Sequence, residues 1–169
     1  NALGLPLLVV GDGPERCYLE RIAGPTVNLL GYQEKHIVEK LMQECRAYVY
    51  AGVEDFGIAP VEAMAAGAPI IALGQGGLLD TVKCATKGIE SATGVLFRDQ
   101  KVKSLLEAVI WFEENELWKK MSSESINKWA QKFSIKSFTR HFELVLMEAW
   151  QMHLNKLDIA SSDPMVFKK

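Results

Sequence analysis

Short apolar runs alternate with amphipathic stretches over the first hundred or so residues of the chain. Five of these runs consist largely of aliphatic or aromatic residues and have the length of buried β-strands; they cover residues 6–10, 26–30, 47–51, 69–73 and 94–97. Between the second and third runs, apolar residues recur every three or four positions, which predicts a helix over about 34–45 with one buried face. This alternation predicts an α/β fold with a Rossmann-like parallel sheet and flanking helices.

Further helices are indicated by capping residues and by helical spacing. Pro60 has the fixed φ that suits the first turn of a helix and Gly67 can end one, so we expect a short helix over 60–67. Beyond residue 100 the strand pattern stops, and three helices are expected, at about 101–113, 115–131 and 135–155. We therefore expect one domain over 1–157 and a loose tail over 158–169, where no periodicity is present.

Composition and charge exclude several classes of protein. The 169 residues are 49% hydrophobic, which is enough for one domain with its own core. The net charge is −2 and both signs are spread along the chain, so neither a nucleic acid nor an anionic membrane is expected as a partner. No apolar segment approaches the ~18 residues that span a bilayer. The three cysteines are odd in number and lack Cys-x-x-Cys spacing, which favours reduced thiols and a cytoplasmic location.

The most informative segment is 54–62, which reads Glu-Asp-Phe-Gly-Ile-Ala-Pro-Val-Glu. A β-prone run, 47–50, precedes it, so a strand is expected to enter a tight turn and the turn to enter a helix, with Glu62 in the first helical turn. The free N–H groups of such a helix start favour an anion, for example a phosphate. Taken singly, a carboxylate and a proline at this position are also ordinary features of a helix start.

The whole segment resembles the Glu-x7-Glu signature of retaining glycosyltransferases with the GT-B fold, the glycogen-synthase-like and sucrose-synthase-like family. This family transfers hexoses from nucleoside diphosphates. Four other segments resemble the family's strands and glycine turns in the same order; they are 7–15, 27–32, 69–77 and 94–97. The resemblance covers about residues 5–100 and identifies the chain with the carboxy-terminal, donor-binding half of such an enzyme, with the first strand of that half missing.

The resemblance implies different roles for the two signature carboxylates. Glu62 matches the carboxylate that accepts hydrogen bonds from the ribose hydroxyls of the nucleotide, for which two acceptor oxygens are well suited. Glu54 matches the carboxylate beside the transferred hexose, where it helps hold the sugar hydroxyls or the positive charge that develops at the anomeric carbon. Glu54 is therefore the predicted catalytic residue.

The other donor-binding residues are expected at the carboxyl ends of strands, where open α/β sheets bind their ligands. The resemblance implies that main-chain N–H groups of the turn after the third strand cradle the diphosphate and that the turn after the second strand meets the base. The predicted donor-binding positions are Phe56, Gly57, Ile58, Ala59, Gly11, Gly13, Gly31 and Tyr32.

No cofactor and no metal are expected. The sequence has no Asp-x-Asp, the pattern by which the other large glycosyltransferase fold holds a divalent cation. Its three histidines, His36, His141 and His153, are scattered without ligand spacing.

Two departures from the family's pattern bear on function. Asp80 stands where many relatives have Glu. Its side chain is shorter, so we do not expect its carboxylate to contact a sugar hydroxyl as the Glu of relatives does. The Arg and Lys that clamp the diphosphate in relatives lie upstream of the point matched by Leu7, before Asn1. We expect the chain to be part of a longer protein, whose amino-terminal domain binds the acceptor, and we expect weak donor binding and no efficient transfer by the chain alone.

The sequence thus predicts a domain that binds a nucleoside diphosphate hexose for retaining transfer to a glycan or lipid-linked acceptor. UDP-glucose is the first expectation for the donor and GDP-mannose the second. Two alternatives stay open, a non-catalytic module that binds nucleotide sugars and a sugar-nucleotide epimerase of GT-B fold. A Rossmann dehydrogenase is disfavoured because Arg16 stands where the motif Gly-x-Gly-x-x-Gly, begun by Gly11 and Gly13, requires its third glycine.

Overall fold

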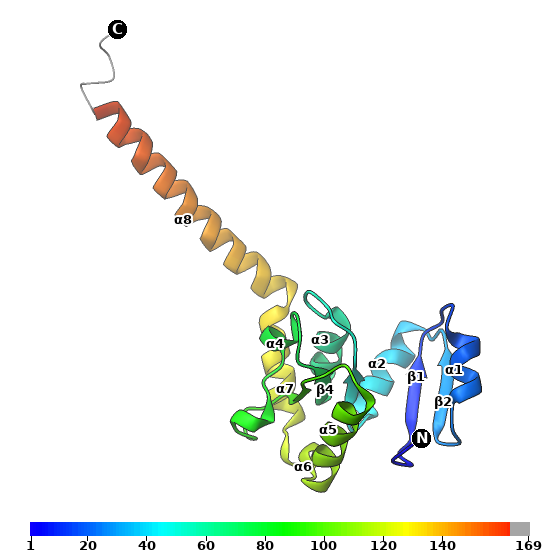
Figure 1. The fold of residues 1–169 in the computed structure, drawn as a ribbon. Coiled ribbons are helices and arrows are strands. Elements are labelled where there is room, and N and C mark those ends of the chain that lie inside the picture. Colours follow the sequence, from blue (N-terminus) through cyan, green and yellow to red (C-terminus); the bar gives the residue numbers. More distant parts are fainter. Residues whose placement is uncertain (163–169) are drawn as a thin grey trace. The chain divides into compact units, whose positions relative to one another are not determined.

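The computed structural model describes residues 1–162. The chain divides into two compact units, one of residues 1–130 and one that begins at Gln131. In chain order the first unit contains β1 (Leu7–Val10), α1 (Arg16–Ile22), β2 (Val27–Gly31), α2 (Lys35–Glu44), β3 (Tyr48–Tyr50), α3 (Ile58–Ala65), β4 (Ile70–Leu73), α4 (Leu78–Thr81), η1 (Ala85–Lys87), β5 (Gly94–Phe97), α5 (Val102–Glu114), α6 (Leu117–Lys120) and α7 (Ser123–Ala130) (Figure 1). Each of the five predicted strands is present, with its ends within one residue of the expected ones.

The strands form parallel sheets, as expected for an α/β fold in which helices connect successive strands. β1 pairs with β2, with Leu7 opposite Val27. β4 lies between β3 and β5, with Ile70 opposite both Tyr48 and Gly94. The predicted fold class is confirmed, but the strands of the described residues form two sheets, of two and three strands, rather than one.

The hydrophobic core is built around β4. All four residues of this strand are buried, and they are apolar without interruption, as is typical of a parallel strand covered on both faces. α5 packs on β4 and β5, α3 packs on β3 and β4, and α7 packs on α3. The largest buried side chains around the strand come from these and neighbouring helices; they include Met64, Leu78, Phe112, Leu117 and Ile126.

The helix that carries the second signature carboxylate starts earlier than predicted. α3 begins at Ile58 because Gly57 adopts the left-handed conformation, with φ of 83°, and turns the chain into the helix two residues before Pro60. Glu62 is therefore in the second turn and not, as predicted, in the first. The predicted stop is confirmed: Gly67 has φ of 93°, and the N–H of Ala68 donates to the carbonyl of Ala63 in a Schellman motif.

The helix predicted over 115–131 is interrupted. Glu116 has φ of 48°, so α5 ends before it and the four-residue α6 begins after it. The chain leaves the helical conformation again at Met121 before α7 starts. Both breaks bring apolar residues into the core, since Leu117 and Met121 are buried.

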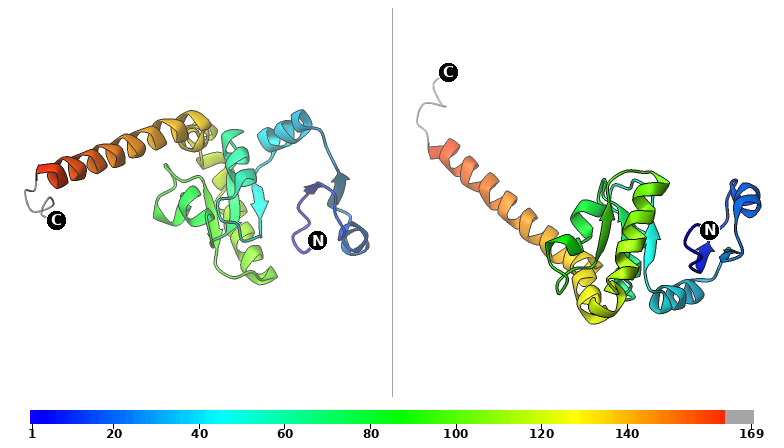
Figure 2. Two further views of the ribbon diagram at one scale, coloured as in Figure 1. Left: turned by 90° about the horizontal axis from the view of Figure 1, so that it is seen from above. Right: turned by 60° about the horizontal axis from the view of Figure 1, so that its bottom comes forward.

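The second unit consists of η2 (Gln131–Phe133) and α8 (Ile135–Ser162). α8 has 28 residues, and Figure 2 shows it as one unbroken helix in two further views. It continues into the segment expected to be a loose tail; the rest of that segment, 163–169, lies outside the described residues. Among the described helices, none is long and apolar enough to cross a membrane.

Candidate functional site

Three loops meet at the carboxyl edge of the β3–β4–β5 sheet. Because the strands are parallel, the loops that follow them leave the sheet at the same edge, which is where open α/β sheets bind ligands. These loops are 51–57 after β3, 74–77 after β4 and 98–101 after β5. The first of them carries Glu54 and leads into α3 and Glu62.

The loops after β3 and β4 touch through their main chains. The N–H of Gly77 donates to the carbonyl oxygen of Glu54 at 2.8 Å. A Cβ added at Gly76 would lie 2.3 Å from that same oxygen, and one added at Gly77 would lie 2.2 Å from the carbonyl oxygen of Asp55. The glycine pair therefore has a structural role, since any side chain at either position would push the two loops apart.

The loop after β5 is joined to the same edge. The N–H of Gly74 donates to the carbonyl oxygen of Phe97 at 2.8 Å, and the side-chain amide of Gln100 donates to the carbonyl oxygen of Ala51 at 2.9 Å. The main chain around Glu54 is thus held on one side by Gly77 and on the other by Gln100.

The Glu54 carboxylate is exposed and accepts a hydrogen bond from Tyr50. The distance from the Tyr50 hydroxyl to Glu54 Oε1 is 2.6 Å. This bond, more than any other cause, raises the pKa of Tyr50 to about 12, so the hydroxyl keeps its proton at neutral pH. Sequence reasoning did not find Tyr50; the available signal was an aromatic residue at the end of a strand, four positions before the carboxylate.

The start of α3 offers main-chain N–H groups without a side-chain cap. Gly57 is the N-cap and has no side chain that could accept their hydrogen bonds. The N–H groups of the first turn have no carbonyl partner within the helix, and they carry the positive end of its dipole. Ile58 and Ala59 are the first two residues of α3, so their N–H groups are placed where the sequence predicted a cradle for phosphate.

Glu62 is exposed in the second turn of α3. Burial raises the pKa of the Tyr48 phenol, and the charge of Glu62 raises it further, which puts this carboxylate near the side chain of Tyr48 on β3. Glu54 and Glu62 therefore lie before and after the uncapped start of one helix. Phe56, between them, is also exposed.

The remaining predicted residues gather at the edge of the other sheet. The N–H of Gly11 donates to the carbonyl oxygen of Gly31 at 2.8 Å, and both glycines have positive φ, of 116° and 66°. The Asp12 carboxylate accepts a hydrogen bond from the N–H of Gly13 at 2.9 Å. Tyr32, the next residue after β2, is 78% exposed.

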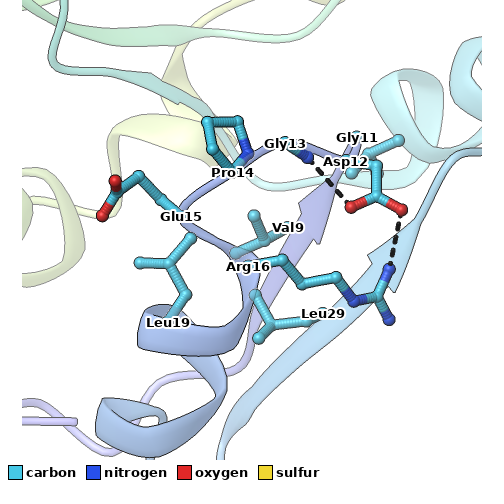
Figure 3. Close-up of a pocket in the computed structure, with 10 residues that line it drawn as sticks. Val9, Gly11, Asp12, Gly13, Pro14, Glu15, Arg16, Leu19 and Leu29 are labelled. Carbon is cyan, nitrogen blue, oxygen red and sulfur yellow. Dashed lines mark hydrogen bonds and ion pairs between the residues drawn. The ribbon is translucent and has the colours of Figure 1, made fainter.

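A shallow pocket lies beside this second group of residues (Figure 3). Its wall includes Arg16, whose guanidinium bridges Asp12 at 3.3 Å and Glu20 at 2.9 Å. Arg16 Nη1 lies against Gly31, since a Cβ added at Gly31 would be 2.6 Å from this atom. The predicted residues are thus brought together as two groups, one at each sheet edge.

Among the residues that the structure describes, no group of three or more His, Cys, Asp or Glu side chains is placed to hold a metal ion.

Solved glycosyltransferase structures share the fold. Sucrose-phosphate synthase from Thermosynechococcus elongatus matches 86% of this chain with a TM-score of 0.69 at 23% identity, and the match covers 39% of the synthase. Anabaena HepE in complex with UDP and glucose matches 84% of the chain with a TM-score of 0.66 at 20% identity, over 40% of its own length. The chain therefore has the α/β fold of GT-B glycosyltransferases.

Sequence relatives point to the same family. The alpha-1,3/1,6-mannosyltransferase of Candida glabrata is 31% identical over 132 residues, which is 74% of this chain and 28% of the relative. The 2-deoxystreptamine glucosyltransferase of Streptomyces kanamyceticus is 38% identical over 93 residues, which is 52% of this chain and 24% of the relative. The chain thus spans about a quarter of the length of these relatives. The sequence model described as "Glycosyl transferases group 1" matches residues 3–133, and the chain belongs to this family.

Proposed function

We propose that the chain is the donor-binding domain of a retaining hexosyltransferase. The observation that carries this proposal is the arrangement at the carboxyl edge of β3, where Glu54 and Glu62 lie on either side of an α-helix start that no side chain caps. Main-chain N–H groups favour a diphosphate, and carboxylates favour the hydroxyls of a ribose and a hexose. A nucleoside diphosphate hexose has all three parts, with the diphosphate between the ribose and the hexose.

In this proposal each group acts on a different part of the donor. Glu62 accepts hydrogen bonds from the ribose hydroxyls. The main-chain N–H groups of residues 56–59 bind the diphosphate. They stabilise the negative charge that the diphosphate gains as the bond from its oxygen to the anomeric carbon breaks. Glu54 lies beside the hexose, where its negative charge favours the positive charge that develops at the anomeric carbon.

At the edge of the two-stranded sheet, the proposed contacts are to the base. The main chain of Gly31 and Tyr32 meets the base, while Gly11 and Gly13 let the backbone approach the nucleotide without a side chain. The positive φ values of Gly11 and Gly31 support this role, because other residues rarely adopt them.

UDP-glucose is our first candidate for the donor and GDP-mannose is the second. Two relatives support this choice in different ways: the Streptomyces relative is a glucosyltransferase, and the Candida relative is a mannosyltransferase. The HepE structures, which share the fold, hold UDP and UDP-glucose. We further propose that the acceptor, a glycan or a lipid-linked sugar, is bound by an amino-terminal domain and that the reaction takes place in the cytoplasm.

The proposal is tested with a panel of UDP, GDP and ADP and their hexose conjugates on the full-length protein. Calorimetry gives the affinity, and release of the nucleoside diphosphate and of a new glycoside gives the turnover. We expect one nucleotide to bind best, and its hexose to be transferred with the configuration of the anomeric carbon kept. Transfer with inversion would overturn the retaining assignment, and failure of every nucleotide to bind would overturn the site.

The same panel distinguishes two other functions. Tight nucleotide binding without any turnover would identify a binding module. Conversion of the donor into its epimer, without glycoside formation, would identify an epimerase.

A further inference from the structure

We propose that Tyr50 is a positioning residue, which holds the Glu54 carboxylate in the orientation that hexosyl transfer requires. This inference rests on the proposed function, because it assigns a partner to the carboxylate that acts beside the hexose. The motif in 54–62 does not include Tyr50.

Tyr50 is the anchored member of the pair. It is the last residue of β3, paired with Ala72 of the buried strand β4, and its side chain packs against the hydrophobic core. Glu54, in contrast, is exposed in the loop that follows. The 2.6 Å hydrogen bond therefore ties the exposed Glu54 side chain to the packed side chain of Tyr50.

The loop between the two residues is shaped to allow this bond. A Cβ added at Gly52 would lie 3.0 Å from the Tyr50 hydroxyl oxygen, so the phenol passes close over a residue without a side chain. The main chain on both sides of Gly52 is held, at Ala51 by Gln100 and at Glu54 by Gly77. With the main chain held, the Glu54 side chain can still change its rotamer. The hydrogen bond from the Tyr50 hydroxyl restricts this rotation.

The direction of the hydrogen bond suits a positioning role. Tyr50 donates to Oε1, which leaves Oε2 of Glu54 to accept a hydrogen bond from the sugar. A hydrogen bond to a carboxylate is also stronger than a hydrogen bond to a neutral acceptor. Because the phenol keeps its proton at neutral pH, it can act as the donor of this hydrogen bond.

The test compares Tyr50→Phe, Glu54→Gln and the double variant in the full-length protein. Tyr50→Phe removes only the hydroxyl, and Tyr18→Phe is the matched control, since Tyr18 is an exposed residue of α1 outside the proposed site. The probes are UDP, for nucleotide affinity, and UDP-glucose, for release of UDP. If the panel above selects another nucleotide, that nucleotide and its hexose conjugate replace them.

We expect Tyr50→Phe to lower kcat/KM for the sugar donor about tenfold, which corresponds to about 1.4 kcal/mol. The affinity for the nucleoside diphosphate should stay unchanged, because the hydroxyl acts through the carboxylate beside the hexose. The double variant should be no worse than Glu54→Gln alone, since the two residues act as one unit. Tyr18→Phe should match the parent protein.

Three results would overturn the inference. Additive losses in the double variant would show that Tyr50 acts independently of Glu54. Equal losses of diphosphate affinity and of turnover in Tyr50→Phe would show a general structural role. An undiminished kcat/KM in Tyr50→Phe would show that the hydroxyl is not needed.

A spectroscopic measurement separates failure of the bond from failure of the proposed function. Titration of the phenols by ultraviolet absorbance, with Tyr50→Phe to assign Tyr50, should give an elevated pKa for this residue that falls in Glu54→Gln. If it does not fall, the hydrogen bond is absent in solution and the inference is wrong whatever the activity. If it falls but the parent protein neither binds nor turns over any donor, the proposed function is wrong and the inference is overturned with it.

Discussion

The amide nitrogen of Gly77 lies 2.8 Å from the carbonyl oxygen of Glu54, so the loop after β4 holds the loop that carries the proposed catalytic carboxylate. The contact depends on the missing side chains of Gly76 and Gly77, which allow two main chains to approach each other. The geometry of the site is therefore set in part by residues that have no functional group of their own.

Gly77→Ala should separate these loops. The φ of Gly77 is −63°, which alanine adopts freely, but the new methyl group would lie 2.2 Å from the carbonyl oxygen of Asp55. We expect a loss of about 1–3 kcal/mol in the free energy of unfolding, measured in urea, together with weaker donor binding. Gly13→Ala is the control for stability, because nothing lies within 4 Å of its added Cβ. Equal stability of the two variants would contradict the steric argument.

Glu62→Ala should weaken nucleotide binding. If Glu62 accepts hydrogen bonds from the ribose, its loss should cost roughly 1.5–3 kcal/mol of binding free energy, as expected for hydrogen bonds to a charged group. Calorimetry with the free nucleoside diphosphate measures this directly. Unchanged affinity in a correctly folded variant would remove Glu62 from the site.

Glu54→Gln should separate the two carboxylates by role. The substitution keeps the size of the side chain and removes its charge, so the affinity for the nucleoside diphosphate should stay nearly the same while hexosyl transfer by the full-length protein falls. The measurement compares UDP affinity with the rate of transfer from UDP-glucose, or the corresponding pair for the nucleotide that binds best. A parallel loss in both quantities would assign Glu54 to nucleotide binding instead.

Phe112→Ala should destabilise the core under β4. Phe112 is 1% exposed and is among the largest buried side chains, so its truncation should cost about 3–5 kcal/mol of unfolding free energy. Ile110→Ala, on the same helix α5, is the control because Ile110 is 39% exposed. Urea denaturation followed by circular dichroism gives both values, and a similar loss in the two variants would contradict the placement of the core.

The hydrogen bond from Tyr50 to Glu54 should be lost at high pH. The pKa of Tyr50 is raised to about 12 in the folded protein, above the ordinary value of 10.0. Because the folded-state pKa is the higher one, the stabilisation is complete below about pH 10 and disappears as the pH rises through about 12. The difference in Tm between the parent protein and Tyr50→Phe should therefore be constant from pH 6 to 9 and then shrink. A difference that shrinks already near pH 7 would exclude this bond as its source.

The strands could be predicted from sequence because each carries a short, largely apolar run. β4 is the best example, since a strand buried on both faces has no polar position that could confuse the pattern. Helix boundaries were harder to predict from the sequence. The break at Glu116 needs an unfavourable positive φ in a non-glycine residue, which is sustained by the burial of Leu117 and Met121 and not by any local preference.

The candidate site was predicted in part. Glu54, Glu62 and the turn between them were accessible because they are close in sequence and form one motif. The contact from Gln100 to Ala51 was not, since it joins residues 49 positions apart and depends on β3 and β5 lying on either side of β4. The hydrogen bond from Tyr50 was not predicted either, because the alternation of apolar residues does not indicate which way a phenol turns at the end of a strand.

The central place of β4 has a consequence for the synthesis of the protein. Its hydrogen-bonding partners, β3 and β5, are the neighbouring strands in sequence, with Ile70 opposite Tyr48 on one edge and Gly94 on the other. When β4 leaves the ribosome, β3 is already available, but the second edge and the cover provided by α5 come later. Until residues 94–114 have emerged, four apolar residues remain exposed beside an unpaired strand edge, which is the kind of surface that chaperones bind and that aggregates. A nascent chain that pauses between Leu73 and Gly94 would be the species most at risk.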